Sequence, residues 1–169
     1  MLSRLVNQAH PLGPGAKVLV LGGGYSGRCF ARLLNTLGTT VICTRRHPET
    51  DCSDLTFDSS TGVLPSFGDL EGISHVLCTI PPSQDGRDPA LECLGALLKN
   101  ISPVWVGYLS TTGVYGDRQG NWVSESDAPS PVQDRSRRRL KCEQAWLNSG
   151  LPVQILRLPG IYGPGRSVL

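Results

Sequence analysis

The sequence predicts an α/β fold in which helices cover both faces of a parallel sheet. Strand-like and helix-like segments alternate along most of the 169 residues, as they do in folds built from βαβ units. The strand-like segments, such as Val18–Leu21, are continuous apolar runs, which indicates burial on both sides. With 39% hydrophobic and 18% charged residues, the chain has the composition of one globular domain with its own core.

The first strand and helix flank a glycine-rich turn. The strand is expected at 18–21 and is followed directly by Gly22-Gly23-Gly24-Tyr25-Ser26-Gly27. A helix is expected over 25–37, where apolar residues recur with a period near 3.6 and Gly38 follows as a stop signal. The chain therefore changes from strand to helix within a few residues.

The rest of the sequence repeats this alternation. Asp88 and Pro89 provide an N-cap and a first-turn proline for a helix that reaches Asn100, and Gly150 follows a helix expected over 135–149. The remaining segments are strands at 41–43, 55–57, 74–80, 104–109 and 153–158 and a long loop at 117–131. Together the elements predict a doubly wound Rossmann fold with strand order 3-2-1-4-5-6 and a ligand crevice at the carboxyl ends of the strands.

The glycine-rich turn predicts a dinucleotide-binding site. Gly22, Gly24 and Gly27 fit the pattern G-x-G-x-x-G between a strand and a helix. At these positions side chains would block the tight turn, the pyrophosphate or the close contact of helix and strand. Tyr25 and Ser26 begin the helix, whose first N–H groups would point at the phosphates. A flexible turn without a ligand is the alternative interpretation.

The residues after the second strand favour NADP over NAD. An NAD site would place Asp or Glu about 20 residues after the glycines, to accept hydrogen bonds from the ribose hydroxyls. This sequence has Thr44-Arg45-Arg46 there, and guanidinium groups pair with a 2′-phosphate instead. Two solvated arginines are the alternative. After the fourth strand, Ile80 and Pro81 are expected to form part of the cofactor pocket wall, because proline fixes the chain without offering a donor.

The other sequence features narrow the class of protein. We expect a leader at 1–16 and an NAD(P)-binding Rossmann domain at 17–169. The net charge of +2 gives no argument for a nucleic-acid or membrane partner, and the lack of a long apolar run or signal peptide predicts a cytoplasmic protein. The six scattered cysteines are expected to be reduced and packed in the core. No metal site is expected, because the three histidines stand alone.

Two motifs after the last strands resemble a known group of enzymes. Ser110-Thr111-Thr112-Gly113-Val114-Tyr115-Gly116 follows the fifth strand, and Arg157-Leu158-Pro159-Gly160-Ile161-Tyr162-Gly163-Pro164-Gly165 spans the end of the sixth. Together with the glycine turn, these motifs resemble the extended and atypical short-chain dehydrogenase/reductases, specifically the NAD-dependent epimerase/dehydratase group. The resemblance covers the chain from Lys17 onward.

The resemblance implies a catalytic hydroxyl and part of a nicotinamide pocket. Thr111 takes the place of the group's catalytic Ser or Thr, which hydrogen-bonds a substrate carbonyl or alcohol. A hydroxyl that caps the local backbone is the alternative. Pro159 and Tyr162 belong to a segment that lines the nicotinamide pocket in this group. Members continue beyond the sixth strand into a substrate-binding region, so a partial chain without that region is expected at Leu169.

The sequence departs from the group at its Tyr-x-x-x-Lys motif. When Glu143 is set on the group's helical Glu, Arg135 and Arg139 take the Tyr and Lys places, whereas a shift by two residues puts Arg137 and Lys141 there. Arginine keeps its proton, so it cannot replace a phenol in proton transfer. It can polarise a carbonyl, bind a carboxylate or phosphate, or contact the nicotinamide ribose. A solvated helix face with a few inward residues is the alternative.

Two functions are compatible with these motifs. The first is an enzyme of epimerase, dehydratase or oxidoreductase type that uses NADP, or less favourably NAD, on a small carbonyl, alcohol or nucleotide-sugar-like substrate. In that enzyme Tyr115 or Tyr162 would be the candidates to replace the missing phenol. The second is a non-catalytic protein that senses NADP(H) or regulates a partner. An FAD or S-adenosylmethionine protein fits the glycine turn alone. The resemblance also implies a homodimer.

Overall fold

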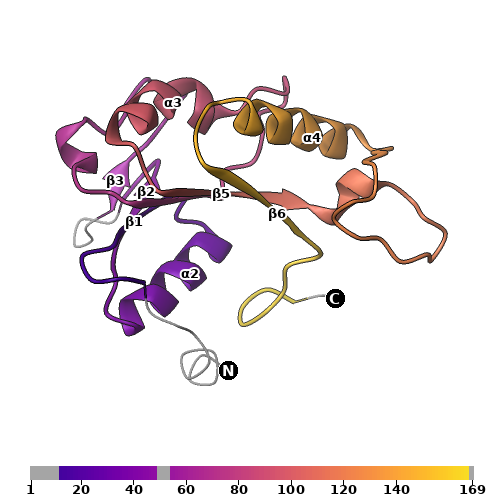
Figure 1. Cartoon of the computed structure of the whole chain (residues 1–169), viewed down its shortest axis with the longest axis horizontal. Coiled ribbons are helices and arrows are strands. Elements are labelled where there is room, and N and C mark those ends of the chain that lie inside the picture. Colours follow the sequence, from indigo (N-terminus) through magenta and orange to yellow (C-terminus); the bar gives the residue numbers. More distant parts are fainter. Residues whose placement is uncertain (1–11, 49–53, 168–169) are drawn as a thin grey trace.

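A computed structural model describes residues 12–48 and 54–167 of the chain (Figure 1). Residues 1–11 of the expected leader, with His10, lie outside the described residues, as does Cys52. The six strands are β1 (Lys17–Leu21), β2 (Thr40–Arg45), β3 (Leu55–Thr56), β4 (His75–Cys78), β5 (Trp105–Thr111) and β6 (Val153–Leu158). The helices are α2 (Tyr25–Thr36), α3 (Pro89–Ile101) and α4 (Asp134–Leu147), with the short 3₁₀ turns η1 (Gly68–Leu70) and η2 (Thr112–Tyr115).

The strands form one all-parallel sheet in the order β3-β2-β1-β4-β5-β6. This arrangement confirms the predicted Rossmann fold and its strand order. Figure 1 shows α3 and α4 on one face of the sheet and α2 on the other. Parallel strands with helices on both faces place all six carboxyl ends along one edge, where ligands bind in this class of fold.

The first strand contributes to a separate core on each face of the sheet. Leu19 and Leu21 pack into the larger core beneath α3 and α4, whereas Val18 and Val20 pack into the smaller core beneath α2. Because successive side chains of a strand point to opposite faces, a strand covered on both sides needs apolar residues at every position. This requirement explains the unbroken apolar run in the sequence.

Helix α2 buries an apolar face, as its sequence period predicts, but leaves one cysteine outside the core. Leu34 is buried, and Phe30 and Leu37 pack against the same core. Cys29 is exposed, so the expectation that the cysteines pack in the core is wrong for this residue. Gly38 ends the helix as predicted, with a positive φ of 80° and an N–H group that donates to the carbonyl of Asn35.

Helices α3 and α4 are joined by a buried hydrogen-bonded carboxylate. Asp88 is the N-cap of α3, as predicted, and its side chain accepts hydrogen bonds from the N–H of Leu91 (2.9 Å) and from Trp146 Nε1 (3.0 Å). Burial raises the pKa of the Asp88 carboxyl. The cap therefore fixes α4 beside α3 as well as starting α3. None of the helices in the described ranges is long and apolar enough to span a membrane.

Candidate active site

Two threonines hold the turn that follows β1. The N–H of Gly22 donates to Thr44 Oγ1 (3.0 Å), and the carbonyl of Gly22 accepts from Thr79 Oγ1 (2.7 Å). A Cβ on Gly22 would lie 2.6 Å from Thr79 Oγ1 and 2.9 Å from the Ile80 side chain. With a φ of +98° as well, this position requires glycine. Thr44 is buried, so its hydroxyl shapes the turn from β2.

The other two glycines of the motif have different surroundings. A Cβ on Gly27 would collide with the carbonyl oxygen of Gly22 and would lie 2.9 Å from Val20, so glycine allows α2 to pack against the turn. A Cβ on Gly24 would meet nothing within 4 Å. Gly24 is also the N-cap of α2, and no side chain caps this end of the helix. The turn thus leaves open space beside the N-terminus of α2, as a pyrophosphate site requires.

The segment after β6 returns to this turn. The hydroxyl of Tyr25 lies against the Cα of Gly163, and the guanidinium of Arg166 stands 5.5 Å from the centre of the Tyr25 ring. Figure 1 shows this segment on the same side of the sheet as α2. Tyr162 is 70% exposed, and Pro159 is exposed at the end of β6. The structure therefore brings the two ends of the predicted cofactor site together through Tyr25.

The two arginines after β2 differ in their surroundings. Arg45 Nε lies 2.6 Å from a carboxylate oxygen of Asp54, and the two side chains are only 19% and 13% exposed. Arg45 also packs beside Gly23, where an added Cβ would lie 3.0 Å from it. Arg46 is exposed. The pairing with Asp54 was not predicted, because the two residues come together only when β3 aligns beside β2.

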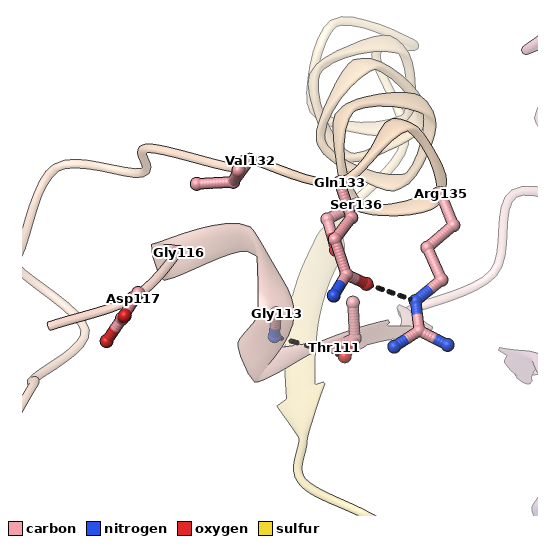
Figure 2. Close-up of a pocket in the computed structure, with 8 residues that line it drawn as sticks. All are labelled: Thr111, Gly113, Gly116, Asp117, Val132, Gln133, Arg135 and Ser136. Atoms are coloured by element: carbon pink, nitrogen blue, oxygen red, sulfur yellow. Dashed lines mark hydrogen bonds between the residues drawn. The ribbon is translucent and has the colours of Figure 1, made fainter. Parts of the chain in front are cut away.

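A pocket of about 400 Å³ lies at the carboxyl end of β5 (Figure 2). It is lined by Thr111, Gly113, Gly116, Asp117, Val132, Gln133, Arg135 and Ser136. The pocket thus brings together two of the three predicted catalytic residues, Thr111 from β5 and Arg135 from the first turn of α4. Thr111 Oγ1 accepts a hydrogen bond from the N–H of Gly113 (3.1 Å), so this hydroxyl also caps η2, as the alternative interpretation held.

The long loop after η2 is anchored at its base. The N–H of Ser130 donates to the carbonyl of Val114 (2.9 Å), and Arg118 Nε donates to the carbonyl of Tyr115 (3.0 Å). A Cβ on Gly116 would collide with the Ser130 carbonyl, and Gly116 has a φ of +74°. These contacts fix the wall of the pocket that Gly116 forms. The tip of the loop extends away from the sheet in Figure 1.

Arg139, the third predicted catalytic residue, donates hydrogen bonds to β5 and to the segment after β4. One terminal nitrogen lies within hydrogen-bond distance of the carbonyls of Leu109 (3.0 Å) and Ile80 (3.4 Å) and of the Tyr108 hydroxyl (3.2 Å). Burial raises the pKa of the Tyr108 hydroxyl. Arg139 therefore links the segment after β4 to β5, at the place that the resemblance gives to Lys.

A buried ion pair fixes α4 to the end of the sheet. Glu143 is only 1% exposed, and it accepts hydrogen bonds from Arg157 Nη2 (2.8 Å) and Nε (3.2 Å) and from the Ser110 hydroxyl. The hydrogen bond to Glu143 raises the pKa of the Arg157 guanidinium. The guanidinium also lies 4.7 Å from the centre of the Tyr115 ring. One carboxylate thus joins α4, β5 and β6.

The surroundings of α4 favour the register that sets Glu143 on the group's Glu. In the shifted register Arg137 and Lys141 would face the substrate, but both are exposed and Arg137 pairs with Asp134 at 2.6 Å on the helix surface. The solvated-face interpretation therefore describes Arg137 and Lys141. Arg135 is exposed as well, but it lines the pocket, and Arg139 is partly buried.

No tyrosine is among the described residues that line the pocket. Tyr115 is buried beneath Arg157, and Tyr162 is exposed on the α2 side of the sheet. Ser136 and Gln133 line the pocket although the sequence did not single them out. No group of three or more metal-ligating side chains occurs in the described ranges.

Comparisons with solved structures test the predicted resemblance. No protein-family model matches the chain. A functionally unknown conserved protein from Silicibacter pomeroyi is 38% identical, with a TM-score of 0.78, and the match covers 89% of this chain. A putative NAD-dependent epimerase/dehydratase from Methylobacillus flagellatus is 28% identical, with a TM-score of 0.76 over 89% of the chain. The predicted resemblance to the epimerase/dehydratase group is confirmed.

A third similar solved structure contains ligands. MoeE5, in complex with UDP-glucuronic acid and NAD, is 26% identical to this chain, with a TM-score of 0.70 over 90% of it. The chain spans between 55% and 57% of the three solved structures and less than half of the curated relatives that it matches.

Replacement of Glu143 tests the buried ion pair. We expect Glu143→Gln to lower the free energy of unfolding by about 3–5 kcal/mol, because Arg157 is left as an uncompensated and largely buried charge. Urea denaturation followed by circular dichroism measures the change. Arg137→Gln is the matched control, since it breaks an exposed pair and should change stability by no more than about 1 kcal/mol. Equal losses in the two variants would contradict the assignment.

Proposed function

We propose that this chain is the nicotinamide-dinucleotide-binding part of an enzyme of the epimerase/dehydratase type that acts on a nucleotide-sugar-like substrate. The turn at Gly22, Gly24 and Gly27 carries the proposal. Each glycine is required for a different reason: a positive φ, open space for a phosphate and a close helix contact. The protein's own packing requires glycine at positions 22 and 27, whereas the open space at Gly24 is the part that supports a bound phosphate.

The proposal gives each predicted residue a place along the bound dinucleotide. The backbone at Gly24, Tyr25 and Ser26 would hold the pyrophosphate at the N-terminus of α2. The pocket wall would be formed at the ends of the strands by Ile80, Pro81, Pro159 and Tyr162. When bound, the nicotinamide ring supplies hydride transfer. Its ribose would lie near Arg139, which already occupies the ends of β4 and β5.

Thr111 is the side chain that we assign to the reacting oxygen of the substrate. Its oxygen accepts from the Gly113 N–H, so its own proton is directed elsewhere and can be donated to a substrate carbonyl or alcohol. Arg135 stands in the same pocket where the group has its Tyr. Because a guanidinium keeps its proton, Arg135 stabilises negative charge there and takes no part in proton transfer.

We further propose that the cofactor is NADP. Arg46 is exposed directly after β2, and a guanidinium at the end of β2 favours the 2′-phosphate. The pairing of Arg45 with Asp54 leaves Arg46 as the stronger candidate for that contact. Thr44 supports this end of the site indirectly, through the hydrogen bond to Gly22.

A second candidate function is a protein that senses NADP(H) without turning over a substrate. The observation that favours it is the pocket itself, whose lining within the described ranges has no tyrosine and has Arg135 in the Tyr place. Such a protein would bind the dinucleotide at the glycine turn but would lack the tyrosine phenol that transfers a proton.

Substitution of Gly24 tests the proposed pyrophosphate site at the N-terminus of α2. We expect Gly24→Ala to weaken NADPH binding at least about tenfold, because the methyl group would enter the space that a phosphate needs. The fold should lose no more than about 1 kcal/mol, since the added Cβ meets nothing in the protein. Titration calorimetry and thermal unfolding measure the two effects. Gly68→Ala, on a 3₁₀ turn where the added Cβ would make only an ordinary contact with Ser66 Oγ at 3.8 Å, serves as the control and should bind normally.

Arginine substitutions test the preference for NADP. We expect Arg46→Ala to weaken NADP binding about tenfold and to leave NAD binding unchanged, because a charge-assisted hydrogen bond to the 2′-phosphate is lost. Calorimetric titrations with both dinucleotides measure the ratio. Arg32→Ala, on the exposed side of α2, should change neither affinity. The preference is refuted if wild-type protein binds NAD as tightly as NADP, or if both Arg45→Ala and Arg46→Ala keep full NADP affinity.

Thr111→Ala separates the enzyme from the sensor. With NADPH and a panel of carbonyl compounds that includes nucleotide-linked keto sugars, we expect measurable oxidation of NADPH and a loss of about 100-fold in kcat/KM on substitution. Thr112→Ala, which removes a neighbouring hydroxyl, should retain the wild-type rate. NADPH binding without turnover in the wild-type protein would favour the sensor.

A further inference from the structure

The pocket at the end of β5 contains hydrogen-bond donors that the protein does not use. Arg135 Nε donates to Gln133 Oε1 at 2.7 Å, which fixes the plane of the guanidinium. No described residue accepts a hydrogen bond from its two terminal nitrogens, and Figure 2 shows them beside Thr111. The Gln133 contact therefore holds the guanidinium in place and leaves its two terminal nitrogens available to a ligand.

A second donor in the pocket is buried. Ser136 follows Arg135 on α4, is only 3% exposed and lines the same pocket. Its hydroxyl packs over Gly113, where an added Cβ would lie 2.8 Å away, and it makes no hydrogen bond to any described residue. The residue as a whole is buried, but it lines the pocket, so its hydroxyl is available to a ligand there.

The acidic residues nearby do not neutralise Arg135. Asp117 lines the pocket, but it lies at the opposite end in Figure 2, and its carboxylate accepts from the N–H of Gln119 at 2.8 Å. Asp134, the neighbour of Arg135 on α4, pairs with Arg137 at 2.6 Å. The end of the pocket next to Thr111 therefore has a positive charge and three donor groups.

We propose that Arg135 and Ser136 form a subsite for a carboxylate group of the substrate, beside the hydroxyl of Thr111 that we assign to the reacting oxygen. This inference rests on the proposed function and makes it more specific: the substrate is an acidic sugar or a similar hydroxy acid. A planar guanidinium binds the two oxygens of a carboxylate with parallel hydrogen bonds, and the serine hydroxyl adds a third donor. A volume of about 400 Å³ accommodates such an acid. The UDP-glucuronic acid bound to MoeE5 carries this chemistry.

The carboxylate could belong to a nucleotide-linked sugar or to a free acid. Two matched pairs of compounds separate these sources: UDP-glucuronic acid with UDP-glucose, and glucuronic acid with glucose. Within each pair the compounds differ by a carboxylate in place of a hydroxymethyl group. Binding of each compound to the NADP-saturated chain is measured by titration calorimetry.

We expect the acid of at least one pair to bind about tenfold or more tightly than its neutral partner. Arg135→Gln should remove this preference, and Ser136→Ala should weaken binding of the acid about fivefold. Arg135→Lys should retain part of the preference, because it keeps the charge but loses the fork. Arg137→Gln, one residue removed from Ser136 on the exposed face of α4, should bind like wild type. Circular dichroism verifies that each variant is folded.

Three outcomes would overturn the subsite: equal affinity for acid and neutral compound in both pairs, a preference that survives in Arg135→Gln, or no binding of any of the four compounds. These outcomes are distinct from failure of the proposed function, which is tested by NADPH binding and its loss in Gly24→Ala. If the chain binds NADPH and none of the acids, the proposed dinucleotide site stands and the carboxylate subsite is refuted.

Discussion

The position of α4 depends on the buried pair between Glu143 and Arg157. The first half of this helix is rich in arginine and offers little apolar surface to the sheet, so hydrophobic burial alone cannot dock it there. Glu143 instead binds Arg157 on β6 and Ser110 on β5. A buried ion pair adds little net stability, but one partner without the other is costly. The pair therefore determines where the helix lies more than how stable the fold is.

The pocket follows from this docking. Thr111 comes directly after Ser110 on β5, and Arg135 lies two helical turns before Glu143, so one carboxylate positions both walls of the pocket. Arg139 lies between Arg135 and Glu143 on the helix and donates to the carbonyls of Ile80 and Leu109. Helix α4 thus supplies two guanidinium groups: that of Arg139 donates to backbone carbonyls, and that of Arg135 lines the pocket.

Local sequence signals were sufficient to predict the framework and the glycine turn between β1 and α2. Strand β6 lies at the predicted residues, and Asp88 caps α3 as predicted, because an apolar run and an N-cap are properties of a few adjacent residues. Contacts between distant residues could not be foreseen in this way. The pairing of Arg45 with Asp54 depends on how β2 and β3 align, and the burial of Ser136 between two arginines depends on the rotation of α4 about its axis.

The contact between Tyr25 and Gly163 links two segments that are separated by most of the chain. Any side chain at position 163 would displace the phenol ring, and Arg166, which lies over that ring, would have to follow. The two positions are therefore expected to change together during evolution: a relative with a small residue in place of Tyr25 has room for a bulkier residue at 163. Paired substitutions of this kind would mark relatives in which the return of the chain to α2 has been rebuilt.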